Sequence, residues 1–193
     1  MGVCHAGPMP ERLPHRVTTA RLELRAWRAD DAGALGEAIT ESIEHLRPWM
    51  PWVAFEPQTV EQRVALIERW QAEWSGGGDS TLGMLSDGRV VGGTGLHRRV
   101  GPDGLEIGYW VHVDHVGRGY AQEASAALTD LALSLPGIRR VVIRHDVANR
   151  RSEGVPRRLG YRLVEEIGDG RRGAPGETGI SRLWERRGCG ASS

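Results

Sequence analysis

The 193-residue sequence contains no lysine, so all 25 of its basic residues are arginines. They are matched by 25 acidic residues, which gives a formal net charge of zero at pH 7. A balanced charge argues against a protein that binds nucleic acid through bulk positive charge. Cysteines are also few. Cys4 and Cys189 lie near opposite ends of the chain, which argues against a disulfide scaffold or a zinc site.

Long apolar runs are absent as well. No stretch of about 18 apolar residues occurs, so no membrane-spanning segment is expected. The N-terminus lacks the charged-then-apolar layout of a signal peptide. The opening "MGVCHA" begins like a myristoylation site but has Ala6 where serine or threonine is required. A cytoplasmic location is therefore the default expectation.

Both ends of the chain lack the periodicity of folded elements. Residues 1–15 contain three prolines and predict a flexible N-terminal tail, and residues 188–193 ("GCGASS") predict a C-terminal tail. No internal repeat or long linker divides residues 16–187. We therefore expect a single domain there, of a size that one hydrophobic core can support.

Seven segments have the apolar pattern of β-strands. They are residues 20–27, 81–86, 88–99, 104–113, 139–147, 161–167 and 179–187. The second and third segments meet at Asp87-Gly88, a pair that is typical of a hairpin turn.

Helical spacing of apolar residues marks four further segments. One segment follows Asp30, which we expect to be its N-cap. Two others span residues 59–74 and 119–134, and a weak one covers about 151–159. Thr59 and Gln62 have the spacing of a capping box. Gly154 and Pro156 weaken the last segment, where we expect a short helix that starts late. The order of elements predicts an α/β fold with a mixed sheet flanked by helices, unlike the regular alternation of a dinucleotide-binding fold.

The stretch "HVGRGYAQEASAALTDLAL" (115–133) places two glycines directly before a predicted helix. Gly117 and Gly119 allow a ligand to approach the backbone closely, and a helix N-terminus favours a negative charge. The stretch therefore fits a phosphate cradle, although a tight turn that needs glycine for geometry alone explains it too. Neither a P-loop nor a complete GxGxxG is present, since Gln122 occupies the third glycine position.

Several motifs appear in a fixed order around this loop: "RLELRAW", "LRPWMPW", "EIGYWV", "GRGYAQEA", and an N-x-x-S followed by "LGY". Together they resemble the GNAT acetyltransferases, in particular their RimJ/RimL-like branch, over roughly residues 18–187. The resemblance implies the GNAT fold: a mixed, mostly antiparallel central sheet of about six or seven strands, flanked by helices and splayed at the cofactor site. It also implies acetyl-CoA as the acetyl donor.

Two backbone segments would hold the donor, by this resemblance. The loop that would bind the pyrophosphate with its N–H groups consists of Val116, Gly117, Arg118, Gly119, Tyr120 and Ala121. The strand end that would pair with the pantetheine arm consists of Trp110, Val111, His112 and Val113. Family members usually have Gln or Arg in place of Val116. The sheet must splay open beside this strand, and Gly108 is a plausible site for the bulge that would allow it.

Asn149 and Ser152 match two further family positions. Asn149 would hydrogen-bond the pantetheine, and Ser152 would lie near the sulfur and could protonate the departing thiolate. Many other GNAT enzymes use a tyrosine seven residues after the asparagine, but Pro156 occupies that place here. Both residues could instead serve only as helix caps.

The acceptor amine must be neutral when it attacks the thioester. At pH 7 roughly 10% of an α-amine is neutral, against less than about 0.1% of a lysine amine. Glu106 is the candidate that would bind the amine or take its proton, directly or through a water. It could also be a charged residue on a solvated strand face. Trp49 and Trp52 would line the acceptor pocket, or else close the core over the sheet.

We therefore expect an acetyl-CoA-dependent N-acetyltransferase that works by direct transfer in a ternary complex. The favoured acceptor is a protein or peptide N-terminal α-amine, and a small-molecule amine (antibiotic, polyamine or amino acid) is the alternative. A non-catalytic acyl-CoA-binding or sensing domain is the second class of function. No metal is expected, because His112 and His115 have no third ligand nearby. No nucleic-acid or membrane partner is expected, and a homodimer is an open expectation.

Overall fold

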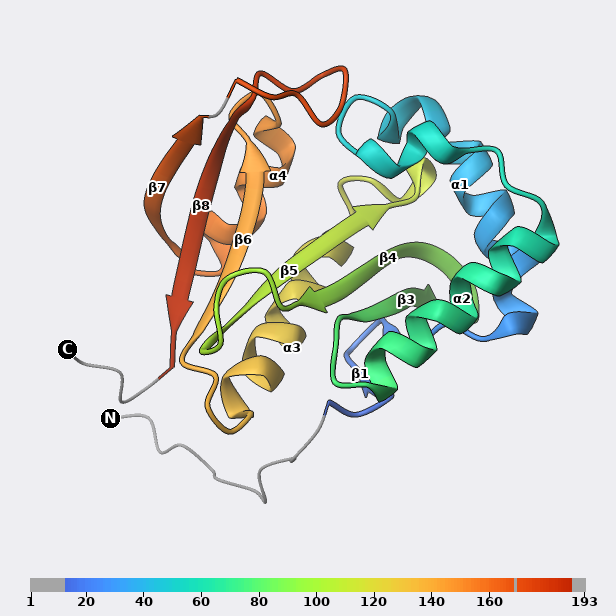
Figure 1. The fold of residues 1–193 in the computed structure, drawn as a ribbon, viewed down its shortest axis with the longest axis horizontal. Helices are drawn as coiled ribbons and strands as arrows, with labels where there is room; N and C mark the ends of the chain where they lie inside the picture. Colours follow the sequence, from blue (N-terminus) through green and yellow to red (C-terminus); the bar gives the residue numbers. More distant parts are fainter. Residues whose placement is uncertain (1–12, 169, 189–193) are drawn as a thin grey trace.

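The computed structural model describes residues 13–168 and 170–188. Within them the strands form one eight-stranded sheet in the order β1-β2-β3-β4-β5-β6-β8-β7 (Figure 1). The strands are β1 (Arg16–Thr18), β2 (Glu23–Ala26), β3 (Ser80–Ser86), β4 (Arg89–His97), β5 (Gly104–Val111), β6 (Arg140–Asp146), β7 (Arg162–Gly168) and β8 (Ile180–Arg187). All neighbours are antiparallel except β5 and β6, so the predicted mixed, mostly antiparallel sheet is confirmed.

In the described residues, four α-helices and three 3-10 turns connect the strands. They are α1 (Ala32–Leu46), α2 (Val60–Ser75), α3 (Tyr120–Ser134) and α4 (Arg150–Arg158), with η1 (Ala29–Asp31), η2 (Pro51–Phe55) and η3 (Val113–His115). The short strand β1 has no predicted counterpart. It contains only three residues, too few for a period-two pattern to be visible in the sequence.

The helices cover opposite faces of the sheet (Figure 1). Leu105 and Ile107 of β5 belong to a core cluster that includes Leu128 of α3. The side chain of Trp110, also on β5, packs against a second cluster that contains Ile39 of α1 and Ile67 of α2. Because successive side chains of a strand point to opposite faces, Glu106 and Gly108 share the face of Trp110, on the side of α1 and α2.

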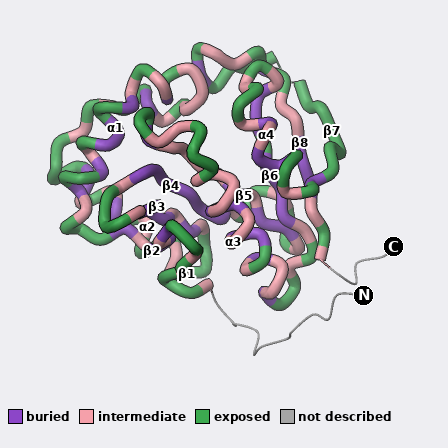
Figure 2. The backbone as a smooth tube through the Cα atoms, turned by 180° about the vertical axis from the view of Figure 1, so that it is seen from behind, coloured by how far each residue is buried: buried purple, intermediate pink, exposed green. Residues whose placement is uncertain are grey.

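The core lies along the central strands. Figure 2 shows β4 and β6 largely buried, whereas β7 at the edge is exposed along its length. Aliphatic side chains of β5, β6 and α3 interdigitate there with 2% or less of their surface exposed; they include Leu105, Ile107, Val141, Ile143 and Leu128. This packing fixes the position of β5, which carries the predicted site residues Glu106, Trp110 and Val111.

The sheet splays open between β5 and β6. The two strands pair only over Gly104–Ile107 and Arg140–Ile143. Beyond Ile107, β5 continues along β4 to Val111, while β6 continues along β8 to Asp146. In Figure 1 the two strands visibly diverge from this point. The predicted bulge at Gly108 is wrong, because the β4–β5 register runs without a shift through Gly95 and Gly108; the splay comes from the end of β5–β6 pairing.

The predicted tails include residues that contact the folded domain, namely Leu13, His15 and Gly188. His15 stacks on Trp74 with ring centroids 4.7 Å apart, and its carbonyl accepts a hydrogen bond from Ala26. Leu13 packs against the core, and Gly188 donates to the Arg139 carbonyl. Residues 1–12 and 189–193 of the predicted tails, with Cys4 and Cys189, lie outside the described part of the chain.

Candidate active site

A cavity of about 1220 Å³ lies on the α1–α2 face of the sheet and reaches into the opening between β5 and β6. Its walls come from η2, α2, β4, β5, the end of β6 and the start of α4. Six of the residues predicted from the sequence line it: Trp49, Trp52, Glu106, Trp110, Asn149 and Ser152. The volume exceeds the roughly 300–1,000 Å³ of an ordinary small-molecule pocket.

The predicted phosphate loop lies at the N-terminus of α3. Gly117 and Gly119 have φ angles of 82° and 81°, a left-handed conformation that favours glycine. No described residue accepts a hydrogen bond from the backbone N–H of either glycine. A Cβ placed on Gly117 would meet no atom within 4 Å, so the space above the loop is open. These features fit the pyrophosphate of coenzyme A.

An arginine–glutamate pair that the sequence did not reveal braces this loop. The Arg21 guanidinium donates to the Arg118 carbonyl at 2.9 Å and to Glu123 Oε2 at 2.7 Å. It also lies 4.8 Å from the centre of the Tyr120 ring. Burial raises the pKa of Glu123, but hydrogen bonds from Thr19 and Arg21 outweigh it and hold the pKa below its usual value. The ionised carboxylate thus fixes Arg21 beneath the loop.

The free edge of β5 follows from its hydrogen bonds to β4. The His112 N–H donates to the Val91 carbonyl at 2.9 Å, so the backbone of His112 faces β4. Backbone groups alternate along an antiparallel strand, and those of Tyr109 and Val111 therefore face away from β4. Since pairing with β6 ends at Ile107, these groups face the opening. They offer the N–H and C=O groups with which a pantetheine arm could pair.

The rest of the predicted pairing segment is anchored to α1. His112 is buried, and its Nε2 lies 2.8 Å from Glu41 Oε2, while its Nδ1 accepts from Asp114 at 3.2 Å. The Val113 N–H donates to the Ser42 hydroxyl. By the same alternation, Trp110 has its backbone toward β4. Of the predicted segment 110–113, only Val111 has backbone groups that face the opening. The backbone groups of Tyr109, which was not predicted, face it as well.

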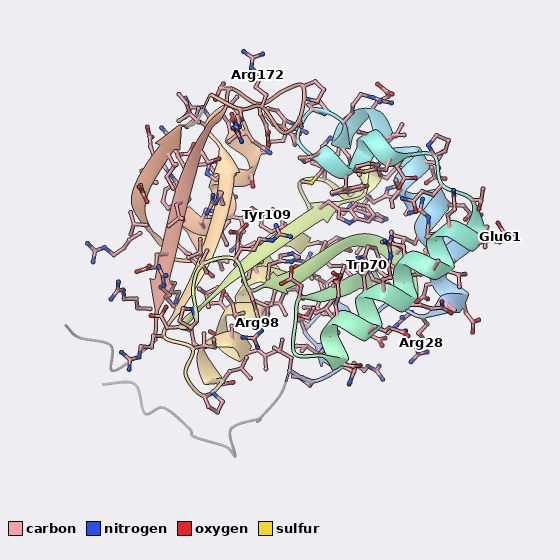
Figure 3. The ribbon with its side chains drawn as sticks, viewed as in Figure 1. Arg28, Glu61, Trp70, Arg98, Tyr109 and Arg172 are labelled. Atoms are coloured by element: carbon pink, nitrogen blue, oxygen red, sulfur yellow. The ribbon has the colours of Figure 1, made fainter. Side chains whose placement is uncertain are left out.

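Ser152, in the first turn of α4, contacts Tyr109 of β5, which is labelled in Figure 3. The two hydroxyl oxygens are 2.8 Å apart, and the Tyr109 hydroxyl also lies 3.2 Å from the Ser152 carbonyl. Pro156 explains why that carbonyl is available. Proline has no N–H, so the helical bond that residue 156 would give to Ser152 cannot form. Burial raises the pKa of Tyr109 to about 12, so the phenol is protonated at neutral pH.

Asn149 is the N-cap of α4. Its Oδ1 accepts a hydrogen bond from the Ser152 N–H at 3.1 Å, so α4 starts directly after it and not late as we expected. The side-chain NH₂ has no partner among the described residues. Asn149 is therefore a cap whose amide can also donate to a ligand.

The other side of the cavity carries the predicted acceptor residues. Glu106 lies 3.8 Å from the Arg144 side chain of β6, and 13% of the Glu106 side chain is exposed. The rings of Trp52 and Trp110 are 6.2 Å apart at 60°. Trp70 adds a further ring from α2, as Figure 3 shows. A carboxylate and aromatic rings thus converge on the face opposite to Tyr109 and Ser152.

Comparison with known proteins agrees with this architecture. The model of the acetyltransferase (GNAT) domain matches residues 21–162, most of the chain. The chain belongs to the GNAT family. The relatives of this GNAT chain include YdaF of Bacillus subtilis (strain 168), which carries a provisional assignment as a ribosomal N-acetyltransferase. It is 28% identical over 152 residues, which cover 77% of this chain and 82% of YdaF.

Solved structures share the GNAT fold of this chain. RimL, the ribosomal L7/L12 α-N-protein acetyltransferase solved with coenzyme A, has a TM-score of 0.78 at 21% identity, over 93% of this chain and 97% of RimL. The microcin C7 self-immunity acetyltransferase MccE, solved with acetyl-CoA and AMP, has a TM-score of 0.82 at 18% identity, over 92% and 98%. RimJ of Mycobacterium smegmatis has a TM-score of 0.76 at 22% identity, over 86% and 81%.

Several sequence-based predictions are thereby confirmed: the RimJ/RimL-like GNAT resemblance, the fold, and an acyltransferase that uses acetyl-CoA. Residues 13–168 and 170–188 contain no helix that is both long and apolar enough to cross a bilayer. The same residues contain no group of His, Cys, Asp or Glu side chains placed to hold a metal ion. A cytoplasmic location and a homodimer stay predictions.

Proposed function

We propose that this GNAT enzyme acetylates the N-terminal α-amine of a protein or peptide, by direct transfer in a ternary complex. One observation carries the proposal. A single cavity joins the free edge of β5 and the Ser152–Tyr109 pair to Glu106 and the tryptophans on the other face. Donor and acceptor can therefore meet without an intermediate carrier. The assignments of YdaF and RimL to ribosomal proteins support the choice of a protein acceptor.

On the donor side, acetyl-CoA supplies an acetyl thioester, the electrophile of the reaction. The N–H groups of the loop from Val116 to Ala121 would hold its pyrophosphate. The backbone of Tyr109 and Val111 and the Asn149 amide would hold the pantetheine arm. Backbone N–H groups of β5 are also fixed dipoles that can stabilise negative charge on the carbonyl oxygen as it develops.

Ser152 would act on the leaving sulfur. The Tyr109 hydrogen can be shared between the Ser152 carbonyl and hydroxyl oxygens, which leaves the Ser152 hydrogen free for the sulfur. A thiol has an ordinary pKa of about 8.5, well below the value of about 12 for Tyr109. A thiolate therefore cannot keep a proton taken from this pair. We assign Ser152 to donate a hydrogen bond to the sulfur while Tyr109 orients the serine.

Glu106 would meet the acceptor amine. Its carboxylate attracts an ammonium group into the cavity, and Arg144 at 3.8 Å limits how strongly that charge is held. An α-amine needs less help to lose its proton than a lysine amine does, because more of it is already neutral at pH 7. Trp49 and Trp52 would contact the side chain next to the amine.

Two other functions remain as alternatives. A small-molecule acceptor is favoured by one comparison, since the MccE structure contains AMP beside acetyl-CoA. A non-catalytic acyl-CoA sensor would have no need of a hydroxyl and a carboxylate facing one cavity, as Ser152 and Glu106 do.

The test is thiol release from acetyl-CoA in the presence of short peptides with free N-termini, and separately of small amines. We expect release with peptides, reduced on the order of 100-fold in Ser152→Ala and in Glu106→Gln. Release with small amines alone would favour the alternative acceptor. Binding of acetyl-CoA without release with any amine would favour the sensor.

A further inference from the structure

A carboxylate holds one nitrogen of a cavity-lining histidine. Asp79 precedes β3, and His97 is the last residue of β4. Asp79 Oδ2 lies 2.8 Å from His97 Nδ1, and Asp79 Oδ1 accepts the Arg98 N–H at 2.8 Å. Burial raises the pKa of Asp79, but the bonds from Arg98 and His97 outweigh it and hold the pKa below its usual value. The carboxylate is therefore ionised and fixed at both oxygens.

The other ring nitrogen of His97 faces the cavity. A Cβ placed on Gly108 would lie 3.1 Å from Nε2, and one placed on Gly95 would lie 3.3 Å from it. The ring thus covers the sheet at two glycines, where any side chain would displace it. Gly108 is also the first residue of β5 beyond its pairing with β6. Nε2 therefore lies at the entrance to the opening, and Glu106 is the cross-strand partner of His97.

The Asp79 contact determines which nitrogen can accept a proton. An ionised carboxylate at 2.8 Å requires a hydrogen on Nδ1, which leaves the lone pair of the neutral ring on Nε2. No described residue bonds to Nε2. A carboxylate that fixes the tautomer and orientation of an imidazole, and stabilises its charged form, is the arrangement by which histidine acts as a general base.

We infer that His97 Nε2 accepts the proton that the acceptor amine loses on attack, with Asp79 as its positioning residue, and that Glu106 binds the amine. This inference rests on the proposed acetyl transfer. The amine nitrogen uses its electron pair to form the amide bond, and the electron pair of the C–S bond leaves with the sulfur. An ammonium acceptor sheds two protons in all. One passes through His97 to water, and the equivalent of the other ends on the thiol.

Four charged groups surround the imidazole. Asp79 and Arg99 approach it from the chain flanking the β3–β4 hairpin, with Arg99 3.4 Å from Nδ1 and 3.7 Å from Asp79 Oδ2. Glu106 faces it from β5, and Arg144 lies beyond Glu106 on β6. Of these groups, Asp79 has the shortest contact with the ring, at 2.8 Å. Removal of the Asp79 charge should therefore affect His97 most.

The experiment measures kcat and kcat/KM of peptide acetylation between pH 5.5 and 9.5 for wild type, His97→Gln and Asp79→Asn, with the affinity for acetyl-CoA measured by calorimetry. His97→Gln should lower kcat about 100-fold at pH 7 and leave the acetyl-CoA affinity within threefold. The loss should shrink as pH rises, because hydroxide then takes the proton in place of His97. Asp79→Asn should lower kcat about tenfold and move the acidic limb of the profile to lower pH, since an amide stabilises an imidazolium less than a carboxylate does.

Added imidazole provides a second readout. It should restore part of the activity of His97→Ala and none of the activity of Ser152→Ala. His15→Gln, on a histidine that stacks on Trp74 and does not line the cavity, is the matched control with wild-type kcat. A His97→Gln enzyme with the wild-type rate and pH profile overturns the inference. So does a pH profile whose acidic limb is kept in His97→Gln and lost only in Glu106→Gln. Absence of amine-dependent thiol release in wild type would instead contradict the proposed function.

Discussion

The phenolic oxygen of Tyr109 lies 2.8 Å from the hydroxyl oxygen of Ser152, although the two residues are 43 positions apart in the sequence. Tyr109 lies on β5 and Ser152 on α4, and only the splay between β5 and β6 allows them to meet. The contact joins the strand that would bind the donor to the helix that carries Ser152, the candidate hydrogen-bond donor to the sulfur. Tyr109 thereby comes to lie beside Ser152, although it belongs to another element than the family tyrosine position that Pro156 occupies.

Tyr109→Phe should lower kcat about tenfold and leave the KM for acetyl-CoA nearly unchanged, because the ring still packs but the hydroxyl no longer orients Ser152. Steady-state kinetics at saturating acetyl-CoA tests this. Tyr161→Phe is the matched control. Tyr161 is also buried, burial raises its pKa to about 12, and its hydroxyl contacts Thr129 beneath α3. Tyr161→Phe should be less stable than wild type but have the same kcat. An equal loss of kcat in both variants would assign Tyr109 a structural role only.

Gly117→Ala should weaken coenzyme A binding and cost about 1 kcal/mol of folding free energy, since an alanine at a φ of 82° is strained. A Cβ there meets no atom, so strain and the changed loop are the only effects. Gly77→Ala is the control, with a φ of 81° and equal space. Denaturant unfolding should show similar losses in both variants. Calorimetry should show weaker coenzyme A binding in Gly117→Ala alone, and unchanged binding there would contradict the loop assignment.

Glu123→Gln should raise the dissociation constant of coenzyme A about tenfold, because the neutral amide releases Arg21 from beneath the loop. The kcat at saturating acetyl-CoA should stay within threefold of wild type. Glu23→Gln alters a more exposed pair, with Arg16, that does not touch the loop, and it should bind like wild type. Equal binding by all three proteins would show that Arg21 does not support the loop.

Asp146 of β6 accepts hydrogen bonds from the loop that precedes β8, and we predict that acid weakens this contact. Burial raises its pKa, but hydrogen bonds from Ala148, Thr178 and Gly179 outweigh this and hold the pKa below 3.8. A carboxylate with a lowered pKa in the folded state adds stability above the pKa of the unfolded state. That stability is lost as pH falls below about 4 and through the folded value. Asp146→Asn should lose stability at pH 7 and show a weaker dependence on pH below 4, measured by denaturant unfolding; an unchanged dependence would contradict this.

Local features of the fold could be predicted from the sequence. Thr59 and Gln62 form the expected capping box, and the hairpin at Asp87-Gly88 is present, because each depends on neighbours along the chain. The cap expected at Asp30 is wrong. Asp31 precedes α1 instead, and its carboxylate binds Arg25, a contact that no local pattern encodes.

The parts of the candidate site that lie in short sequence motifs could be predicted. The contacts between residues that only the folded sheet brings together could not. The loop of Gly117 and Gly119 and the pair Asn149 and Ser152 stood out by spacing. Tyr109 did not, because its partner is brought to it by the splay of the sheet. Asp79 and His97 come together only because the β3–β4 hairpin places the start of β3 beside the end of β4. In the sequence alone, His97 has no visible partner.

The most direct test of the account compares one peptide in two forms: a free N-terminus, and an acetyl-blocked N-terminus with a free lysine side chain. The measurement is kcat/KM for amine-dependent thiol release from acetyl-CoA, with the modified position read by mass spectrometry. The account predicts at least a 100-fold preference for the free N-terminus, with the acetyl group on the α-amine. Equal rates for the two peptides, or transfer to small amines and to neither peptide, would contradict it.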